Sequence, residues 1–222
     1  MIRPMTVILL LAVMVTAGCS LFKSARDDRP ANILAETGME AYRDGRYRKA
    51  IENFEQLRDW YPFSKYAILA ELKIADAYFK LEEFEEAAVA YEEFENLHPR
   101  NEAIPYVIYQ IGRCHFDRID TVDRDQGQTR KALEAFQRLI SRYPNDAYAL
   151  KAREHERDCY KSLAGHDLYV GKFYFKGRHY KAALGRFMRV INDYPDVGVQ
   201  YEALKYIAVC QHAIQLELGA LE

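Results

Sequence analysis

The chain is poor in residues that break helices and lacks the patterns that build catalytic sites. Its 222 residues include only 7 prolines, 11 glycines and 5 serines. It contains no GxSxG, Walker or HExxH pattern, and its six histidines lack the spacing of metal ligands. These absences count against a hydrolase, a nucleotide-binding enzyme and a metalloenzyme. We therefore expect a protein that is not an enzyme and needs no cofactor, with an unrecognised hydrolase as the weakest alternative.

An excess of basic charge is also missing. Residues 19–222 carry 30 basic and 33 acidic side chains, which argues against binding to nucleic acid. Half of the chain is apolar, and 17 tyrosines and 11 phenylalanines supply large side chains for a core. This composition favours a globular protein whose helices pack through aromatic residues.

The apolar run near the N-terminus, residues 6–15, is too short to span a bilayer comfortably. It follows Arg3 and precedes the small residues of TAGCS at positions 16–20, which is typical of a secretion signal. The segment resembles the cleavage box of bacterial lipoproteins, in which the cysteine carries the lipid. It predicts a lipoprotein signal peptide over residues 1–18 and lipidation at Cys19; an ordinary signal peptide with a chance cysteine is the alternative.

A lipidated Cys19 would anchor the mature chain to a membrane, since each buried CH₂ group contributes about 0.8 kcal/mol. By the sorting rule of bacterial lipoproteins, Ser20 implies the outer membrane. Residues 19–32 are largely polar and are expected to form a flexible tether. The other three cysteines lie in apolar helical patterns, which favours buried free thiols over a disulfide; they are Cys114, Cys159 and Cys210.

One pattern recurs four times along the chain. It consists of an alanine, an aromatic residue four positions later and a proline eight positions after that. The copies are Ala50, Phe54 and Pro62; Ala87, Tyr91 and Pro99; Ala132, Phe136 and Pro144; and Ala183, Phe187 and Pro195. A small residue lies twelve positions before the alanine in three copies, as Gly38, Ala75 and Gly171.

This pattern resembles the tetratricopeptide repeat, a helix-turn-helix unit of about 34 residues. Small residues let two helices approach, the aromatic side chain fills the space beside the alanine, and proline ends the second helix. We therefore predict an all-α solenoid of about five repeats, with repeats 1 and 2 in residues 33–102 and repeats 3 to 5 in residues 103–222. The segment 147–163 is either part of a long first helix in repeat 4 or a unit of its own.

A solenoid of this kind has a concave groove lined by its first helices. Aromatic side chains beside cations would suit an extended peptide that ends in a carboxylate. The alternative is that the tyrosines are packing residues and the cations are solvated. From the repeat register, the candidate groove residues are Tyr42, Arg43, Asp76, Phe79, Lys80, Tyr106, Tyr109 and Arg113.

An insert between the two helices of repeat 3 separates this chain from ordinary tetratricopeptide proteins. Together with three downstream segments, it resembles the BamD/ComL family of outer-membrane assembly lipoproteins over residues 19 to about 213. The segments are Thr121–Gln126, Arg142-Tyr143-Pro144-Asn145, Leu163-Ala164-x-His166, and the run from Tyr174 through Tyr180, Ala182 and Ala183 to Arg186. Asp123, Arg124 and Asp125 of the insert are expected to brace their own loop.

The resemblance implies a non-enzymatic scaffold of the machinery that inserts β-barrel proteins into the outer membrane. Its implied partners are unfolded outer-membrane proteins and the periplasmic domains of a BamA-like barrel-forming subunit, and its implied location is the periplasmic face of the outer membrane. By the same resemblance, Arg186 is the leading docking residue, with Arg189 and Lys181 beside it. A solvated arginine on a helix surface is the alternative for Arg186.

Charge is distributed unequally between the two parts of the chain. Residues 19–102 carry 12 basic and 18 acidic side chains, whereas residues 103–222 carry 18 basic and 15 acidic ones. Such an asymmetry suits two different partners. The competing hypothesis is another periplasmic tetratricopeptide adaptor lipoprotein that coordinates cell-envelope enzymes; the absence of heptads before Ile33 counts against an adaptor with an N-terminal coiled coil.

Overall fold

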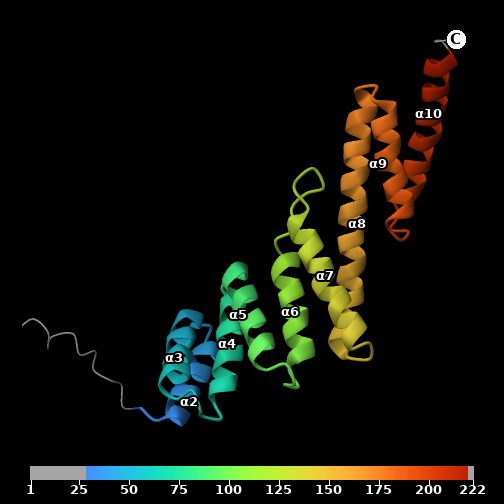
Figure 1. Ribbon diagram of the computed structural model, residues 1–222. Helices are drawn as coiled ribbons and strands as arrows, with labels where there is room; N and C mark the ends of the chain where they lie inside the picture. The colour runs from blue at the N-terminus through green and yellow to red at the C-terminus, as the bar shows by residue number, and fades with distance from the viewer. Residues whose placement is uncertain (1–28, 220–222) are drawn as a thin grey trace, which may run out of the picture.

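The computed structural model describes residues 29–219, so the predicted signal peptide, Cys19 and most of the predicted tether lie outside the described residues. Within this range the chain forms helices and no strand, which confirms the predicted all-α class (Figure 1). The helices are α2 (Ala31–Arg43), α3 (Tyr47–Trp60), α4 (Ala67–Lys80), α5 (Phe84–Leu97), α6 (Ile104–Phe116), α7 (Gly127–Arg142), α8 (Ala147–Lys176), α9 (Tyr180–Asn192) and α10 (Gln200–Gly219).

Successive helices pack against one another as antiparallel pairs, and the pairs are stacked side by side into an elongated array (Figure 1). The four pairs are α2 with α3, α4 with α5, α6 with α7, and α8 with α9; α10 is the first helix of a fifth unit. The second helix of each pair ends shortly before the proline of the repeat pattern, because proline lacks the N–H that an interior helical position requires. The solenoid of helix-turn-helix repeats is therefore confirmed.

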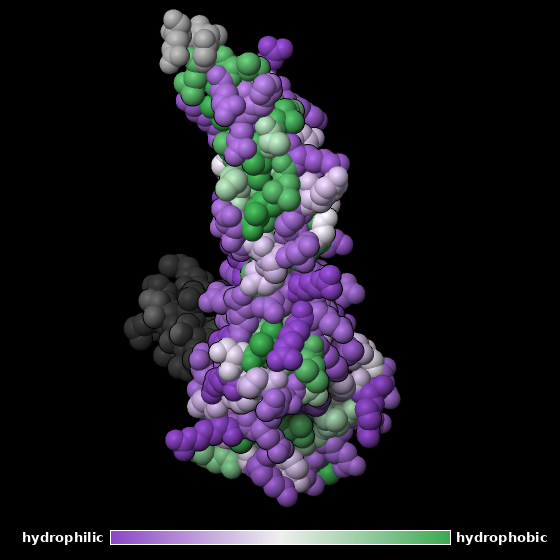
Figure 2. All heavy atoms as spheres, turned by 90° about the vertical axis from the view of Figure 1, so that its right-hand side faces the viewer, coloured by the Kyte–Doolittle hydropathy of each residue, from purple (hydrophilic) through white to green (hydrophobic). Residues whose placement is uncertain are grey.

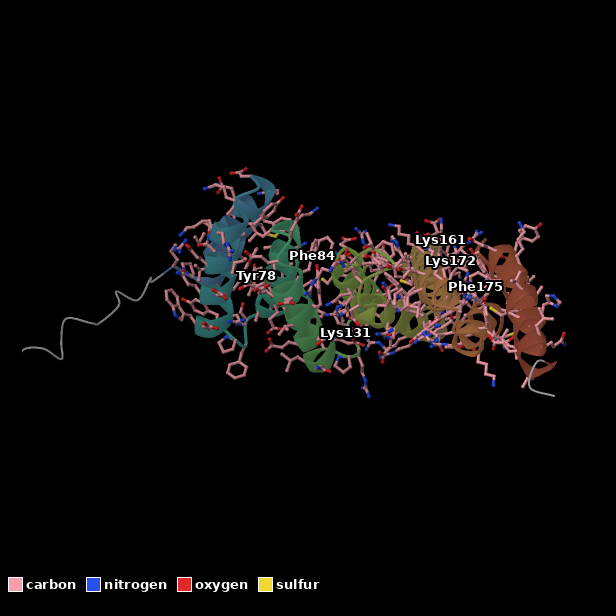
Figure 3. The ribbon with its side chains drawn as sticks, turned by 90° about the horizontal axis from the view of Figure 1, so that it is seen from above. Tyr78, Phe84, Lys131, Lys161, Lys172 and Phe175 are labelled. Carbon is pink, nitrogen blue, oxygen red and sulfur yellow. The ribbon has the colours of Figure 1, made fainter. Side chains whose placement is uncertain are left out.

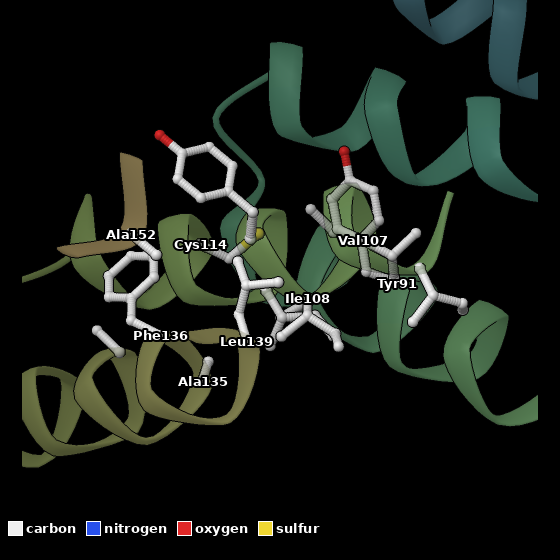
Figure 4. Close-up of a cluster of buried hydrophobic side chains, with 14 of the residues drawn as sticks. Tyr91, Val107, Ile108, Cys114, Ala135, Phe136, Leu139 and Ala152 are labelled. Carbon is white, nitrogen blue, oxygen red and sulfur yellow. The ribbon is translucent and has the colours of Figure 1, made fainter. Parts of the chain in front are cut away.

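Helix α8 is a single helix of 30 residues, which settles the alternative left open for residues 147–163. Its first half packs into the core formed with α5, α6 and α7 through Ala149, Ala152 and Cys159 (Figure 4). Its second half packs into the core formed with α9 and α10 through Ala164 and Leu168. Repeat 4 thus has a long first helix that joins two cores.

The first core is formed by α2, α3 and α4, the middle core by α5, α6, α7 and the first half of α8, and the last core by the second half of α8 with α9 and α10. Tyr78 of α4, labelled in Figure 3, packs against both the first and the middle core. The thiols of Cys114, Cys159 and Cys210 are buried in the middle and last cores and are not paired, as expected. Burial raises the pKa of Cys114 to about 12, so this thiol stays protonated. None of the helices between residues 29 and 219 combines the length and the apolar composition that crossing a membrane requires.

The small residues of the repeat pattern lie directly against its aromatic rings. A Cβ atom added at Gly171 would come within 2.5 Å of the Phe187 ring, and one at Gly38 within 2.6 Å of the Phe54 ring. Gly112 makes the same contact with Phe136, although it stands twenty positions before Ala132 rather than twelve. The insert adds the eight extra positions, which is why the sequence pattern missed this glycine.

We expect Gly171→Ala to lower the free energy of unfolding by about 1–3 kcal/mol, because the added methyl group overpacks against the fully buried Phe187 ring. The matched control is Gly185→Ala in α9, where an added Cβ meets nothing within 4 Å. That control should be neutral or stabilise the helix by up to about 1 kcal/mol. Urea denaturation of the two variants tests this, and equal effects would contradict the close-approach role of Gly171.

Candidate functional site

A buried carboxylate lies between the second and third repeats. Asp76 of α4 is 4% exposed and accepts hydrogen bonds from the hydroxyls of Tyr91 (2.7 Å) and Tyr106 (2.6 Å) and from Lys73 Nζ (2.6 Å). Gln110 Nε2 donates to both tyrosine oxygens at 3.3 Å. These five residues, the Asp76 network, tie α4, α5 and α6 together.

The repeat pattern itself positions this network. Tyr91 occupies the aromatic position that is phenylalanine in the other three copies, and its additional hydroxyl reaches the carboxylate one residue after Ala75. Lys73 precedes Asp76 by three residues and so lies on the same side of α4. Burial, and next the charge of Asp76, raise the pKa of Tyr91 and Tyr106, so both phenols remain hydrogen-bond donors.

Aromatic side chains extend this contact along the first helices of successive repeats. The Lys73 ammonium lies over the Tyr42 ring at 5.1 Å from its centroid. In the other direction, the Tyr106 ring meets the Tyr148 ring edge-on at 5.3 Å. The structure thus links α2, α4, α6 and the first half of α8 through side chains on one side of the solenoid, and we call this surface the first-helix face.

Beside Tyr148, the Tyr109 hydroxyl lies 3.0 Å from Nε2 of His155. The guanidinium of Arg113 lies over the Phe79 ring at 5.8 Å and forms a 2.8 Å ion pair with Asp117. These contacts complete the first-helix face on α6 and α8.

The candidate groove residues fall into three classes. Asp76 and Tyr109 are buried, so they support the first-helix face and do not project from it, contrary to expectation. Tyr42, Phe79, Tyr106 and Arg113 are half-buried within it, and Arg43 and Lys80 are exposed at the ends of their helices. Sequence reasoning missed Lys73, Gln110, Tyr148 and His155; the spacing of Lys73 from Asp76 was the one local signal.

A cleft of about 750 Å³ lies elsewhere, bordered by α5, α6 and α7. Glu85 and Glu95 stand on its α5 side, and they pair with Arg118 and Arg138 respectively, the latter at 2.9 Å. The facing charges of this cleft therefore neutralise each other. Among residues 29–219, no group of three His, Cys, Asp or Glu side chains is placed to hold a metal ion.

A second buried carboxylate joins α8 to α9. Asp167 is 1% exposed and accepts hydrogen bonds from Arg186 Nη1 and from the Tyr194 hydroxyl, each at 2.8 Å, while Arg189 Nη2 lies 3.3 Å away. Burial, together with the hydrogen bond to Asp167, raises the pKa of Tyr194 to about 12. These four residues form the Asp167 network.

The Asp167 network gives two of the three candidate docking residues an internal partner. Arg186 is half-buried and Arg189 is exposed, so part of each guanidinium still reaches the surface. Lys181 is exposed on the first turn of α9.

The insert loop is fastened to the middle of α8. Gln126, which is buried, accepts a hydrogen bond from Ser162 Oγ at 2.8 Å, and the carbonyl oxygen of Val122 lies 2.7 Å from Nδ1 of His166. Inside the loop, Asp123 accepts from the Thr121 hydroxyl, and Asp125 accepts from the Gly127 N–H at the start of α7. Arg124 lies 3.9 Å from Asp123. The loop therefore braces both itself and the long helix.

Comparison with known proteins agrees with this architecture. A family model described as YfiO, outer membrane lipoprotein, matches residues 27–220. The outer membrane protein assembly factor BamD of Vibrio cholerae is 31% identical over 206 residues, which cover 88% of this chain and 86% of that protein.

Two further matches show how much of each chain is similar in sequence and in fold. BamD of Caulobacter vibrioides is 31% identical over 178 residues, and the matched part spans 80% of this chain but 58% of that protein. The solved TPR2AB domain of yeast Sti1, in complex with pHSP90, has a TM-score of 0.51 and 17% identity, covering 83% of this chain and 70% of that one, which supports the tetratricopeptide fold. The chain belongs to the YfiO family of outer membrane lipoproteins, the family of the BamD assembly factors.

Proposed function

We propose that this protein is a non-enzymatic scaffold that takes part in assembling proteins of the outer membrane. Family membership supports the process, because its curated relatives are named outer membrane protein assembly factors. The stacked helical pairs support the scaffold role, since solenoids bind partners over extended surfaces. In this proposal a lipid on Cys19 holds the chain at the periplasmic face of the outer membrane.

The first-helix face is the proposed binding surface for unfolded outer-membrane proteins. The observation that carries this assignment is the row of half-buried aromatic rings flanked by cations, from Tyr42 over Lys73 to Tyr106, Tyr148 and Arg113. Flat rings can pack against apolar side chains of an extended segment, and the ammonium and guanidinium groups can pair with a terminal carboxylate. The buried Asp76 fixes two members of the row in place.

The last two repeats are the proposed docking surface for a barrel-forming subunit. Apolar side chains gather on the outer surface of α10 and the end of α8, where Figure 2 shows hydrophobic residues over the later repeats. They are Phe173, Tyr201, Leu204, Val209 and Leu216. Arg186, Arg189 and Lys181 on the neighbouring α9 add positive charge, which can steer and orient an acidic partner.

Purification of the complex through a tag on this chain tests the proposal. We expect a membrane protein with a β-barrel and periplasmic domains to be recovered with it. Recovery of cell-envelope enzymes in its place would favour the competing adaptor hypothesis, and recovery of neither class would contradict the proposed scaffold role.

The substrate face has its own test. We expect Lys80→Glu combined with Arg113→Glu to weaken binding of C-terminal peptides of barrel proteins about tenfold, equivalent to about 1.4 kcal/mol, because two cations become anions beside the aromatic row. The matched control is Lys176→Glu with Arg178→Glu, which makes the same charge change at exposed positions near the turn between α8 and α9. Fluorescence anisotropy of a labelled peptide reports the affinity, and equal losses in both variants would place the binding surface elsewhere.

A further inference from the structure

The turns between successive repeats lie along one edge of the array. Helices alternate in direction, so the turns 61–66, 98–103 and 143–146 all fall at the same end of their helical pairs, as Figure 1 shows along the lower side. We call these three turns, with the helical residues next to them, the turn edge. The turns within repeats, at 44–46, 81–83 and 117–126, form the far edge.

The turn edge exposes one large apolar side chain near each turn. Phe63 is 102% exposed, Leu97 at the end of α5 is 59% exposed, and Leu150 in the first turn of α8 is 56% exposed. Ile68 on the first turn of α4 adds a fourth, at 41%. An exposed apolar side chain thus recurs on the turn edge from the first repeat to the fourth.

The two edges also differ in charge. Over the first three repeats, the turns of the far edge contain seven acidic and three basic residues, whereas the turns 61–66, 98–103 and 143–146 contain two of each sign. The turn 193–199, at the same end of the last pair, adds two acidic residues and no basic one, so the difference is confined to the first three repeats. Lys65 and Arg100 are the exposed cations of the turn edge, Lys151 follows Leu150 on α8, and Glu102 is its exposed acidic residue. Within the first three repeats, a negatively charged surface would therefore repel the far edge more strongly than the turn edge.

The chain reaches the first repeat at the turn edge. The Tyr61 hydroxyl donates to the carbonyl oxygen of Arg29 at 3.0 Å, which places the start of the described chain beside the turn that carries Phe63. Arg29 lies ten positions after Cys19, and a fully extended segment of that length spans at most about 35 Å. An anchor at Cys19 can therefore bring the turn edge, where the described chain begins, against the membrane.

We propose that the turn edge is a membrane-contacting surface, in which Phe63, Leu97 and Leu150 enter the headgroup region while Lys65 and Arg100 pair with anionic lipids. Aromatic and aliphatic side chains beside cations are the composition that binds bilayer interfaces. The contact orients the solenoid beneath the membrane, so that its first-helix face and last repeats stay accessible to proteins. The choice of the edge that faces the membrane rests on the proposed lipid anchor at Cys19. The test removes that anchor, so that any binding to vesicles comes from the protein surface.

The experiment uses the mature chain, residues 19–222, with Cys19→Ser, and measures its flotation with vesicles of three parts phosphatidylethanolamine and one part phosphatidylglycerol. We expect binding that decreases with salt and that falls at least tenfold when Phe63, Leu97 and Leu150 are all changed to serine. The matched control changes three equally exposed apolar residues of the later repeats to serine and should bind normally; they are Phe173, Leu204 and Leu216. No measurable binding before mutation, or equal binding by both triple variants, overturns the inference.

A fluorescence measurement tests the same contact without removing apolar residues. Trp60 is the single tryptophan, so Trp60→Phe with Phe63→Trp moves the reporter onto the turn edge. Brominated lipids should quench this reporter, and they should leave Trp60→Phe with Phe173→Trp unquenched. Equal quenching of the two reporters overturns the inference.

Co-purification separates this inference from the proposed function. The Phe63, Leu97 and Leu150 triple variant, with Cys19 intact, should still recover the barrel-forming subunit. Loss of that subunit with unchanged vesicle binding would make the turn edge a protein interface and overturn the membrane assignment. Failure of the unaltered chain to recover the subunit would count against the proposed function alone.

Discussion

Arg186→Glu is expected to remove at least nine tenths of the barrel-forming subunit recovered with this chain, and also to destabilise the chain itself. The substitution places a second carboxylate beside Asp167, which is buried and depends on Arg186 for its shortest ion pair at 2.8 Å. Leaving a buried charge without its partner costs about 3–5 kcal/mol. Thermal unfolding followed by circular dichroism should shift downward by about 10 °C.

A paired variant separates docking from stability. Asp167→Asn with Arg186→Gln removes both charges and retains groups that can bond to each other, so the unfolding temperature should recover most of the loss. If Arg186 also contacts the partner, recovery of the subunit stays low in this double variant. Full recovery would show that Arg186 acts only within the Asp167 network, and Lys181 and Arg189 would then be the docking residues to test.

Asp76→Ala is expected to have the second large effect, a loss of about 3–5 kcal/mol in the free energy of unfolding. Tyr91 is fully buried, and its hydroxyl would lose the carboxylate acceptor that lies 2.7 Å away. Each buried donor left unsatisfied costs about 1–3 kcal/mol, and Tyr106 and Lys73 lose the same acceptor. Urea denaturation measures the loss.

The same variant should weaken peptide binding at least tenfold, because Tyr106 and Lys73 would no longer be held in the first-helix face. The control is Tyr91→Phe, which restores the phenylalanine of the other repeats and should cost at most about 1.5 kcal/mol. In Asp76→Ala with Tyr91→Phe, the two losses should be less than additive, since the unsatisfied hydroxyl has been removed. Strict additivity would mean that Asp76 does not act through Tyr91.

The helical repeats were predictable because their signals are local. The alanine, aromatic and proline of each copy lie within twelve residues, and each acts within a single helix-turn-helix unit. The copies at Phe54, Tyr91, Phe136 and Phe187 are all fully buried in the structure. Gly112 was not found because the pattern was counted as a fixed number of sequence positions. Packing depends on the position of a residue along its helix, and the length of the insert between α6 and α7 does not change it.

The candidate site was predictable only in part. Register placed Tyr106 and Arg113 on the correct helices, but it does not show how deeply a side chain is covered by the neighbouring repeat. Asp76 is buried by α5 and α6, and the partners that satisfy it come from three helices. Tyr148 and His155 were missed because their helix had two possible readings until its 30-residue length was known.

The sequence by itself determined that this protein is a stack of helical pairs with the family's insert, because short-range spacing specifies each pair. The tertiary structure alone decided which charges are internal. Arg186 lies 19 residues from Asp167, and His166 lies 44 residues from Val122, so their contacts arise only when separate helices and loops pack. Burial then makes these contacts strong, since a carboxylate removed from water must be satisfied by whatever side chains the neighbouring helices bring to it.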